Sequence, residues 1–281
     1  MPKADEGNIA IFAGRGSLPR AVATGLVHRG NRMPYLIGIE GEHEDWIYDY
    51  NHVVLHWGQF GGLFKFLKNN NITQMLFAGA MNRPSISNVK MDLVAIKTLP
   101  QIMAFIVGGD NSMLSGVIKV FENRGIKIVG AHQIIPELLA APGLIAGRKP
   151  SRKALANMEK AFEASKLLGS LDIGQAAVAV GKRVVAVEGI EGTDQLLARV
   201  ADMRKSGRLT EDGTHGVLVK TMKPKQDMRV DLPAIGPDTI QHAFEAGLAG
   251  VAVEAGKSFI LDREETVSLA KKLGVFIHGL D

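Results

Sequence analysis

The first half of the chain alternates short apolar runs with longer stretches whose apolar positions recur every three or four residues. The run from Ile9 to Ala13 predicts a buried strand, followed by a tight glycine turn and a helix that Pro19 begins. The same two patterns predict strands over 52–57, 74–80 and 126–130, and helices over 61–71, 91–105 (with a break near Pro100) and 111–125. Strands that alternate with helices are typical of an α/β domain with a mainly parallel sheet.

The pattern changes in the second half. Residues 135–150 are rich in Pro and Gly and predict a linker. After it we expect helices over 154–169, 193–207, 239–250 and 262–274 (capped by Asp262), a strand over 216–220 and a strand pair over 251–261. Residues 176–188 are two apolar strands around Gly181-Lys182, a hairpin signature. The prediction is an N-terminal Rossmann-like domain (1–134), the linker (135–150) and a C-terminal catalytic α+β domain with a mixed sheet (151–281), with a ligand cleft between the domains.

Composition narrows the possible chemistry. The 281 residues include no cysteine, which excludes disulfides, thiolate nucleophiles and cysteine-bound metals. The eight histidines show no HxH or HExxH spacing, so a histidine-rich metal site is not expected. A net charge of +4 favours an anionic partner, but the dispersed Lys and Arg residues favour a phosphorylated small molecule over nucleic acid. With neither a membrane-length apolar run nor a signal-peptide pattern, we expect a cytoplasmic protein.

The turn Gly14-Arg15-Gly16-Ser17 stands between the first strand and the first helix, where glycines and a helix N-terminus can cradle a phosphate. A plain tight turn explains it equally well. Pro19 replaces the Gly or Ala of a dinucleotide fingerprint, and we find no clear acidic ribose partner about 20 residues on, which counts against NAD. Two later loops, 79–84 with Arg83 and 108–111 with Asp110, resemble ligand loops, although Asp110 or Asn111 could simply cap a helix.

The segment from Lys220 to Asp231 is half charged in a chain that is 22% charged. Its polar–apolar alternation predicts an extended strand with Asp227, Arg229 and Asp231 on one face. Carboxylates there could bind Mg²⁺ or Mn²⁺ or serve as a general base, while Lys220, Lys223 and Arg229 could balance phosphate charge. The alternative is a surface strand whose salt bridges contribute about 0–1 kcal/mol each.

A second acidic group, Glu188, Glu191 and Asp194, ends one strand and opens a helix, and glycines surround Glu191. Thr193 or Asp194 could instead be only the N-cap of that helix. Gln175 belongs to a third polar turn. Carboxylates, cations and glycine turns together favour phosphoryl transfer or phosphate-ester hydrolysis.

Six motifs occur in order over nearly the whole chain: GRGSLP, GAMNRP, GGDNSML, LDIGQ, VEGIEGTD and KPKQDMRVDLPAIGPDT. Together they resemble the UDP-2,3-diacylglucosamine pyrophosphatase family of lipid A biosynthesis, the LpxI type. The resemblance implies hydrolysis of UDP-2,3-diacylglucosamine to UMP and 2,3-diacylglucosamine 1-phosphate (lipid X), a need for Mg²⁺, two domains with the lipid product between them, and attack by water on the sugar-side phosphorus. It also implies an essential aspartate, which Asp227 matches. Asn111 departs from the acid expected in its loop.

From the resemblance and the residues together we expect Asp227 to bind the metal or orient water. Further metal ligands are expected among Asp231, Glu188, Glu191 and Asp194. We expect Lys220, Lys223 and Arg229 to contact phosphate oxygens. Other contacts with the substrate are expected from Gly14, Gly16, Ser17, Arg83, Asp110, Gln175 and Thr193. Peripheral contact with the inner membrane and a homodimer are further expectations. The alternative functions are a non-catalytic sugar-nucleotide or lipid-binding regulator and a nicotinamide-dependent oxidoreductase.

Overall fold

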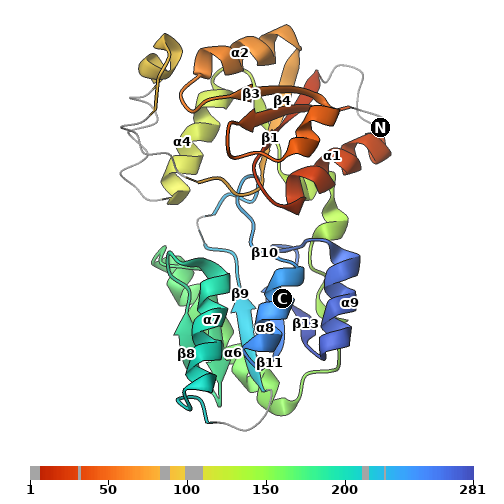
Figure 1. Ribbon diagram of the computed structural model, residues 1–281, viewed down its shortest axis with the longest axis vertical. Coiled ribbons are helices and arrows are strands. Elements are labelled where there is room, and N and C mark those ends of the chain that lie inside the picture. The colour runs from red at the N-terminus through yellow and green to blue at the C-terminus, as the bar shows by residue number, and fades with distance from the viewer. Residues whose placement is uncertain (1–6, 31–32, 83–88, 99–109, 211–214, 225) are drawn as a thin grey trace. The chain divides into compact units, whose positions relative to one another are not determined.

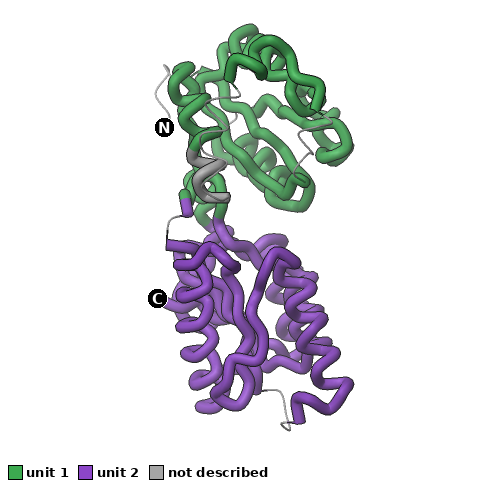
Figure 2. Tube along the Cα trace, turned by 90° about the vertical axis from the view of Figure 1, so that its left-hand side faces the viewer, with its two compact units in different colours: residues 1–136, 227–231 green, residues 137–226, 232–281 purple. Residues whose placement is uncertain are grey.

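The computed structural model describes residues 7–30, 33–82, 89–98, 110–210, 215–224 and 226–281, with the backbone alone for 110–115. The chain divides into two compact units (Figure 2). Unit 1 holds Met1–Pro136 and Asp227–Asp231, and unit 2 holds Glu137–Gln226 and Leu232–Asp281. The segment Asp227–Asp231, which we expected in the second domain, therefore belongs to unit 1. Much of the expected linker belongs to unit 2, where it contributes a strand to the sheet.

Unit 1 is built on a five-stranded parallel sheet (Figure 1). The strand order is β3-β2-β1-β4-β5, and every neighbouring pair is parallel. This confirms the predicted Rossmann-like sheet. The strands are β1 (Asn8–Ala13), β2 (Tyr35–Ile39), β3 (Asn51–Leu55), β4 (Ile72–Ala78) and β5 (Lys127–Ile128).

Helices of unit 1 bury apolar stripes against this sheet. In α2 the residues Leu63 and Leu67, four apart, are both buried in a core with Met75 of β4 and Phe121 of α4. The helices are α1 (Ser17–Gly30), α2 (Phe60–Asn69), α4 (Asp110–Glu122), α5 (Ala131–Ile134) and the 3-10 helix η1 (Asp45–Asp49).

Unit 2 is built on a mixed sheet of order β6-β13-β11-β9-β7-β8, as predicted for the second domain. Strands β9, β11 and β13 are parallel, and the other pairs are antiparallel. The strands are β6 (Gly143–Ala146), β7 (Ala176–Val180), β8 (Arg183–Val187), β9 (Gly216–Lys220), β11 (Leu248–Glu254) and β13 (Phe276–Leu280). A separate parallel pair joins β10 (Ala234–Ile235) to β12 (Phe259–Ile260).

Both faces of the mixed sheet are covered by helices (Figure 1). Ala177 and Ala179 of β7 pack with α6, whereas Val178 and Val180, which point the opposite way, share a core with the other three helices. This two-sided burial explains why β7 is apolar throughout. The helices are α6 (Arg152–Ser170), α7 (Gly192–Lys205), α8 (Pro237–Glu245) and α9 (Arg263–Leu273), and a 3-10 turn, η3 (Pro136–Leu138), leads into the unit.

Several local predictions can be compared with the structure. The hairpin of β7 and β8 is confirmed, since Gly181 and Lys182 both have the positive φ that its turn requires. Helix α8 ends before the expected residue 250, because β11 begins at Leu248. Asp262 stands at the start of α9, but its side chain makes no capping hydrogen bond. Among the helices that the structure describes, none is long and apolar enough to span a bilayer.

Candidate functional site

The carboxyl ends of the five parallel strands define one edge of unit 1, and ligands of open α/β sheets bind at that edge. Three segments leave the sheet there, and the first two carry sequence motifs. They are the glycine turn after β1, the segment from Gly79 after β4, and Val129–His132 after β5. Two of the expected ligand loops, 14–17 and 79–84, therefore start from one edge. Arg83 and residues 108–109 lie outside the described residues, and the side chain of Asp110 is not described.

The first backbone N–H groups of the glycine turn are already hydrogen-bonded to other backbone groups of the protein. The N–H groups of Gly14 and Arg15 donate to the carbonyls of Ala78 (2.8 Å) and Ala80 (2.9 Å). A Cβ on Gly14 would lie 2.5 Å from the carbonyl oxygen of Ala80, so this close approach requires glycine. Gly16 has φ +96° and donates to the Glu44 carboxylate at 2.8 Å. These contacts favour a tight turn, so the phosphate contact expected of Gly14 and Gly16 stays a prediction.

An acidic loop follows β2 at the same edge. The Glu42 carboxylate accepts the N–H of Asn82 at 2.9 Å and pairs with Arg15 at 3.3 Å. Glu40 comes directly after β2 and contacts His56. Glu40 stands at the end of the second strand, which is the position of the acidic ribose partner in a dinucleotide fold. The prediction that no clear acidic residue follows the glycine turn at that distance is therefore corrected. The apolar run YLIGI, which ends at Ile39, is the signal that locates Glu40.

The segment Asp227–Asp231 is a turn, so the predicted strand is wrong. The Asp227 carboxylate accepts the backbone N–H of Arg229 at 2.9 Å. The Asp227 carbonyl accepts the N–H groups of Val230 and Asp231, both at 3.1 Å. Asp side chains that bond the backbone two residues on compete in this way with sheet pairing. Alternation in sequence therefore does not place the three charged residues on one strand face.

This turn lies against the residues that follow β5. His132 Nδ1 is 3.1 Å from the Met228 carbonyl oxygen. Gly130 allows close approach, since a Cβ there would lie 3.0 Å from Arg229 Cα. Val230 packs against the apolar core of unit 1. Asp227 is thus held near the carboxyl end of β5, on the edge where the other ligand loops begin.

Arg229 holds the Asp227 carboxylate with both arms of its guanidinium. Nη2 is 2.7 Å from Oδ2, and Nε is 3.0 Å from Oδ1. The third nitrogen, Nη1, donates to Glu122 at 2.8 Å. The hydrogen bond from Arg229 lowers the pKa of Asp227, against the opposing effect of burial, so the carboxylate is ionised at neutral pH. In this structure Arg229, expected on phosphate, binds two carboxylates.

In unit 2 the residues after β9 are fixed by two neighbouring elements. The N–H of Thr221 donates to the Gln175 carbonyl at 2.9 Å, and Lys223 Nζ is 2.8 Å from Asp172. Lys220 Nζ donates to the carbonyl of Ala234 at 3.1 Å. The LDIGQ and KPKQ motifs are therefore in direct contact, and both lysines expected on phosphate have partners within unit 2.

Glu254, which the sequence analysis did not select, also holds this segment. Its side chain is 7% exposed and accepts the Met222 N–H at 3.2 Å. Lys166 and Lys257 donate to its two oxygens at 2.7 and 2.8 Å. Burial raises the pKa of Glu254, but the two lysines outweigh it and the net pKa is lowered. Glu254 follows an apolar run at the end of β11, and that position is the signal that could have found it.

The predicted acidic ligands of unit 2 each have a protein partner. Buried Glu188 accepts the N–H of Gln175 at 2.8 Å and the hydroxyl of Thr193 at 2.5 Å. Glu191 pairs with Arg199, and Asp194 lies 3.2 Å from His242. Gln175 Oε1 is buried and has no hydrogen-bond partner among the described residues.

The five predicted metal ligands are divided between the units, with Asp227 and Asp231 in unit 1 and the three others in unit 2. Within the described ranges, no three His, Asp or Glu side chains come together in a group that could hold a metal ion. The metal site remains a prediction.

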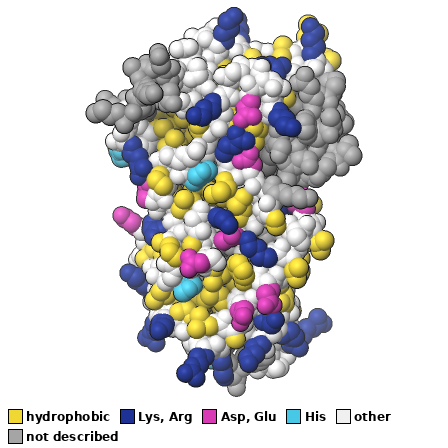
Figure 3. All heavy atoms as spheres, turned by 180° about the vertical axis from the view of Figure 1, so that it is seen from behind, with side chains coloured by type: hydrophobic (Ala, Val, Ile, Leu, Met, Phe, Trp, Pro, Cys, Tyr) yellow, Lys and Arg dark blue, Asp and Glu magenta, His cyan; other side chains and the backbone are white. Residues whose placement is uncertain are grey.

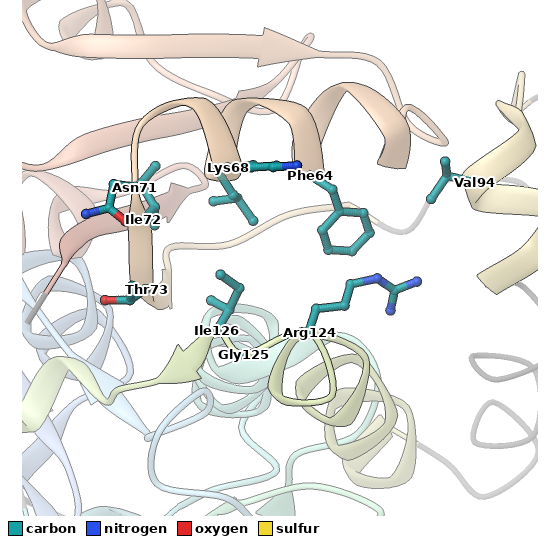
Figure 4. Close-up of a pocket in the computed structure, with 10 residues that line it drawn as sticks. Phe64, Lys68, Asn71, Ile72, Thr73, Val94, Arg124, Gly125 and Ile126 are labelled. Carbon is teal, nitrogen blue, oxygen red and sulfur yellow. The ribbon is translucent and has the colours of Figure 1, made fainter.

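A pocket of about 460 Å³ lies at the opposite edge of the unit 1 sheet (Figure 4). Asn71, Ile72 and Thr73 line it where β4 begins, together with Gly125 and Ile126 just before β5. No predicted site residue lines this pocket, and it stands apart from the ligand edge. Apolar side chains are also exposed on the surface among charged ones (Figure 3). The most exposed in unit 2 are Leu167, Leu171, Ile173 and Ile190.

Comparisons with known proteins agree over both halves of the chain. Residues 8–138 match the LpxI N-terminal domain, and residues 141–278 match the LpxI C-terminal domain. A UDP-2,3-diacylglucosamine pyrophosphatase LpxI of Caulobacter vibrioides is 40% identical over 224 residues, which is 80% of each chain. The order of the motifs, the two units and both domain matches lead to one conclusion: this chain belongs to the LpxI family.

Proposed function

We propose that this protein hydrolyses the pyrophosphate of UDP-2,3-diacylglucosamine to UMP and 2,3-diacylglucosamine 1-phosphate. The observation that carries the proposal is the 40% identity to a protein named for this activity. The ionised Asp227 at the ligand edge of unit 1 supports it, since phosphoanhydride hydrolysis needs a group that orients water.

In the proposed reaction a water oxygen bonds to one phosphorus while the bridging P–O bond breaks. The bridging oxygen leaves with the other phosphate, and a water proton is lost. We assign the attack to the sugar-side phosphorus, as the resemblance implies. Asp227 accepts a hydrogen bond from the water, and Arg229 keeps that carboxylate ionised and in one orientation.

We further propose that the reaction needs Mg²⁺ or Mn²⁺. Carboxylate oxygens are the ligands these cations prefer, and Asp227 is an ionised, partly exposed carboxylate. Asp227 and Asp231 of unit 1 would hold the cation. When bound, it would neutralise charge on the diphosphate. Glu188, Glu191 and Asp194 belong to unit 2, so we give them second place as ligands.

The family match argues against both rival functions, a non-catalytic regulator and a nicotinamide-dependent oxidoreductase. Glu40 removes one argument against the oxidoreductase, but Pro19 and the family favour the hydrolase. Inner-membrane contact and a homodimer remain predictions.

The test is UMP release from UDP-2,3-diacylglucosamine in detergent with Mg²⁺, with and without EDTA. We expect metal-dependent release by the wild type and by Asp202→Asn, an exposed control. Tight ligand binding without release would overturn the assignment in favour of a regulator. In ¹⁸O-water, label in the lipid phosphate rather than in UMP would support attack at the sugar-side phosphorus.

A further inference from the structure

Glu122 is the last residue of α4, where a carboxylate is unfavourable. The carbonyl end of a helix carries partial negative charge, so a glutamate there is disfavoured unless a cation offsets it. The cation here is Arg229, whose Nη1 lies 2.8 Å from Glu122 Oε1 across 107 residues of sequence. Glu122 thus has a charged partner in a distant segment, in addition to Lys119 in the last turn of its own helix.

Arg229 is shared between two carboxylates. Its Nε and Nη2 contact both oxygens of Asp227, while its Nη1 donates to Glu122. Salt bridges between mobile surface side chains are weak, but a planar guanidinium with a carboxylate on each side has little freedom to rotate. The orientation of Arg229 thus depends on Glu122 as well as on Asp227.

The backbone of the turn is held separately. Val230 packs in the core of unit 1, and His132 contacts the Met228 carbonyl. Loss of the Glu122 carboxylate would therefore leave the turn in place and free only the outer arm of Arg229.

We propose that Glu122 is a positioning residue of the reaction, acting through Arg229 to hold the Asp227 carboxylate in one orientation. This inference rests on the proposed hydrolase function. Glu122 need not touch the substrate, because its side chain reaches Asp227 through the guanidinium. Its effect should therefore appear in kcat and not in KM.

The experiment is a double-mutant cycle with Glu122→Gln, Arg229→Gln and both together, measured by UMP release at several substrate concentrations. We expect Glu122→Gln to lower kcat about ten- to hundredfold with KM nearly unchanged, the range found for groups that orient metal-binding side chains. In the Arg229→Gln protein, adding Glu122→Gln should cause no further loss of kcat, because the guanidinium through which Glu122 acts is already absent. Glu122→Asp should recover part of the activity if its shorter side chain still reaches Arg229.

Glu163→Gln, which removes an exposed ion pair on α6 of unit 2, is the matched control and should behave as the wild type. Thermal unfolding of each variant separates a folding defect from a catalytic one. Normal kcat in Glu122→Gln overturns the inference alone, and so does an equal loss in the wild-type and Arg229→Gln backgrounds. No UMP release by the wild type overturns the proposed function, and this inference with it.

Discussion

Replacing Asp227 by Asn removes one charge and almost no volume. The amide oxygen can still accept the Arg229 N–H that closes the turn, so the lost interaction is the pair with the guanidinium. Asp227 is 27% exposed and Arg229 35%, so solvent weakens that pair. We expect the free energy of unfolding to fall by about 1 kcal/mol. Since the free energy of unfolding of a domain is roughly 5–15 kcal/mol, the variant should remain folded.

The expected effect on the reaction is larger. Loss of a carboxylate that orients or activates water lowers kcat about 10²- to 10⁴-fold. At about 1.36 kcal/mol per tenfold, this equals roughly 3–5 kcal/mol of lost transition-state stabilisation. A destabilisation of about 1 kcal/mol cannot produce such a loss by unfolding. The assay is UMP release at saturating substrate, paired with urea unfolding of the same samples.

Two outcomes would refute this reasoning. An Asp227→Asn protein that keeps more than about a tenth of the wild-type kcat would exclude the carboxylate from the chemistry. A loss of activity matched by a loss of folded protein would make Asp227 a structural residue. Asp202→Asn, with the same charge change on an exposed helix, should leave both measurements unchanged.

Three further predictions concern other positions. Gly130→Ala should destabilise the fold by about 1–3 kcal/mol in urea unfolding, because its new Cβ would lie 2.4 Å from the His132 ring and 3.0 Å from Arg229 Cα; unchanged stability would mean that both neighbours move freely. The lowered pKa of Glu254 stabilises the fold above about pH 4.3, and this contribution is lost as pH falls through the native pKa. Urea unfolding at pH 7 and pH 3 should show Glu254→Gln less stable than wild type at pH 7 and nearly equal to it at pH 3; a gap that stays constant would contradict the role of Lys166 as its ionic partner. Gln175→Leu should leave stability nearly unchanged in thermal unfolding but raise KM for UMP release, since the unpaired Oε1 is lost to the ligand; an unchanged KM would rule that contact out.

The parts of the fold that sequence predicts well depend on local signals. The strand, glycine turn and helix at the start, and the hairpin at Gly181-Lys182, each need only a few neighbouring residues to specify them. The turn at Asp227 could not be predicted in this way. Its polar and apolar residues alternate as in a strand. Its shape, however, is determined by a local side-chain hydrogen bond and by contacts with residues about a hundred positions earlier.

The candidate site was predictable to a similar extent. Asp227 and Arg229 stand out because charge is dense around them, and the structure pairs them. Glu122 contacts Arg229 across 107 residues of sequence, and His132 contacts the Met228 carbonyl across 96, distances that no spacing rule covers. One sequence signal does point to Glu122, because it is an acidic residue at the C-terminal end of an amphipathic helix, where acidic residues are disfavoured.

The segment Asp227–Asp231 comes from the second half of the chain but completes unit 1, and this has a consequence during synthesis. A ribosome releases the N-terminal residues first, and domains usually fold in that order. Unit 1, however, lacks Val230 from its core and the counterion of Glu122 until residue 231 has emerged. Most of unit 2 is available by then, so the first unit is completed only after much of the second has been made. A fragment cut at residue 136 would be an unfinished domain, and a cut between the two halves should not yield two independent proteins.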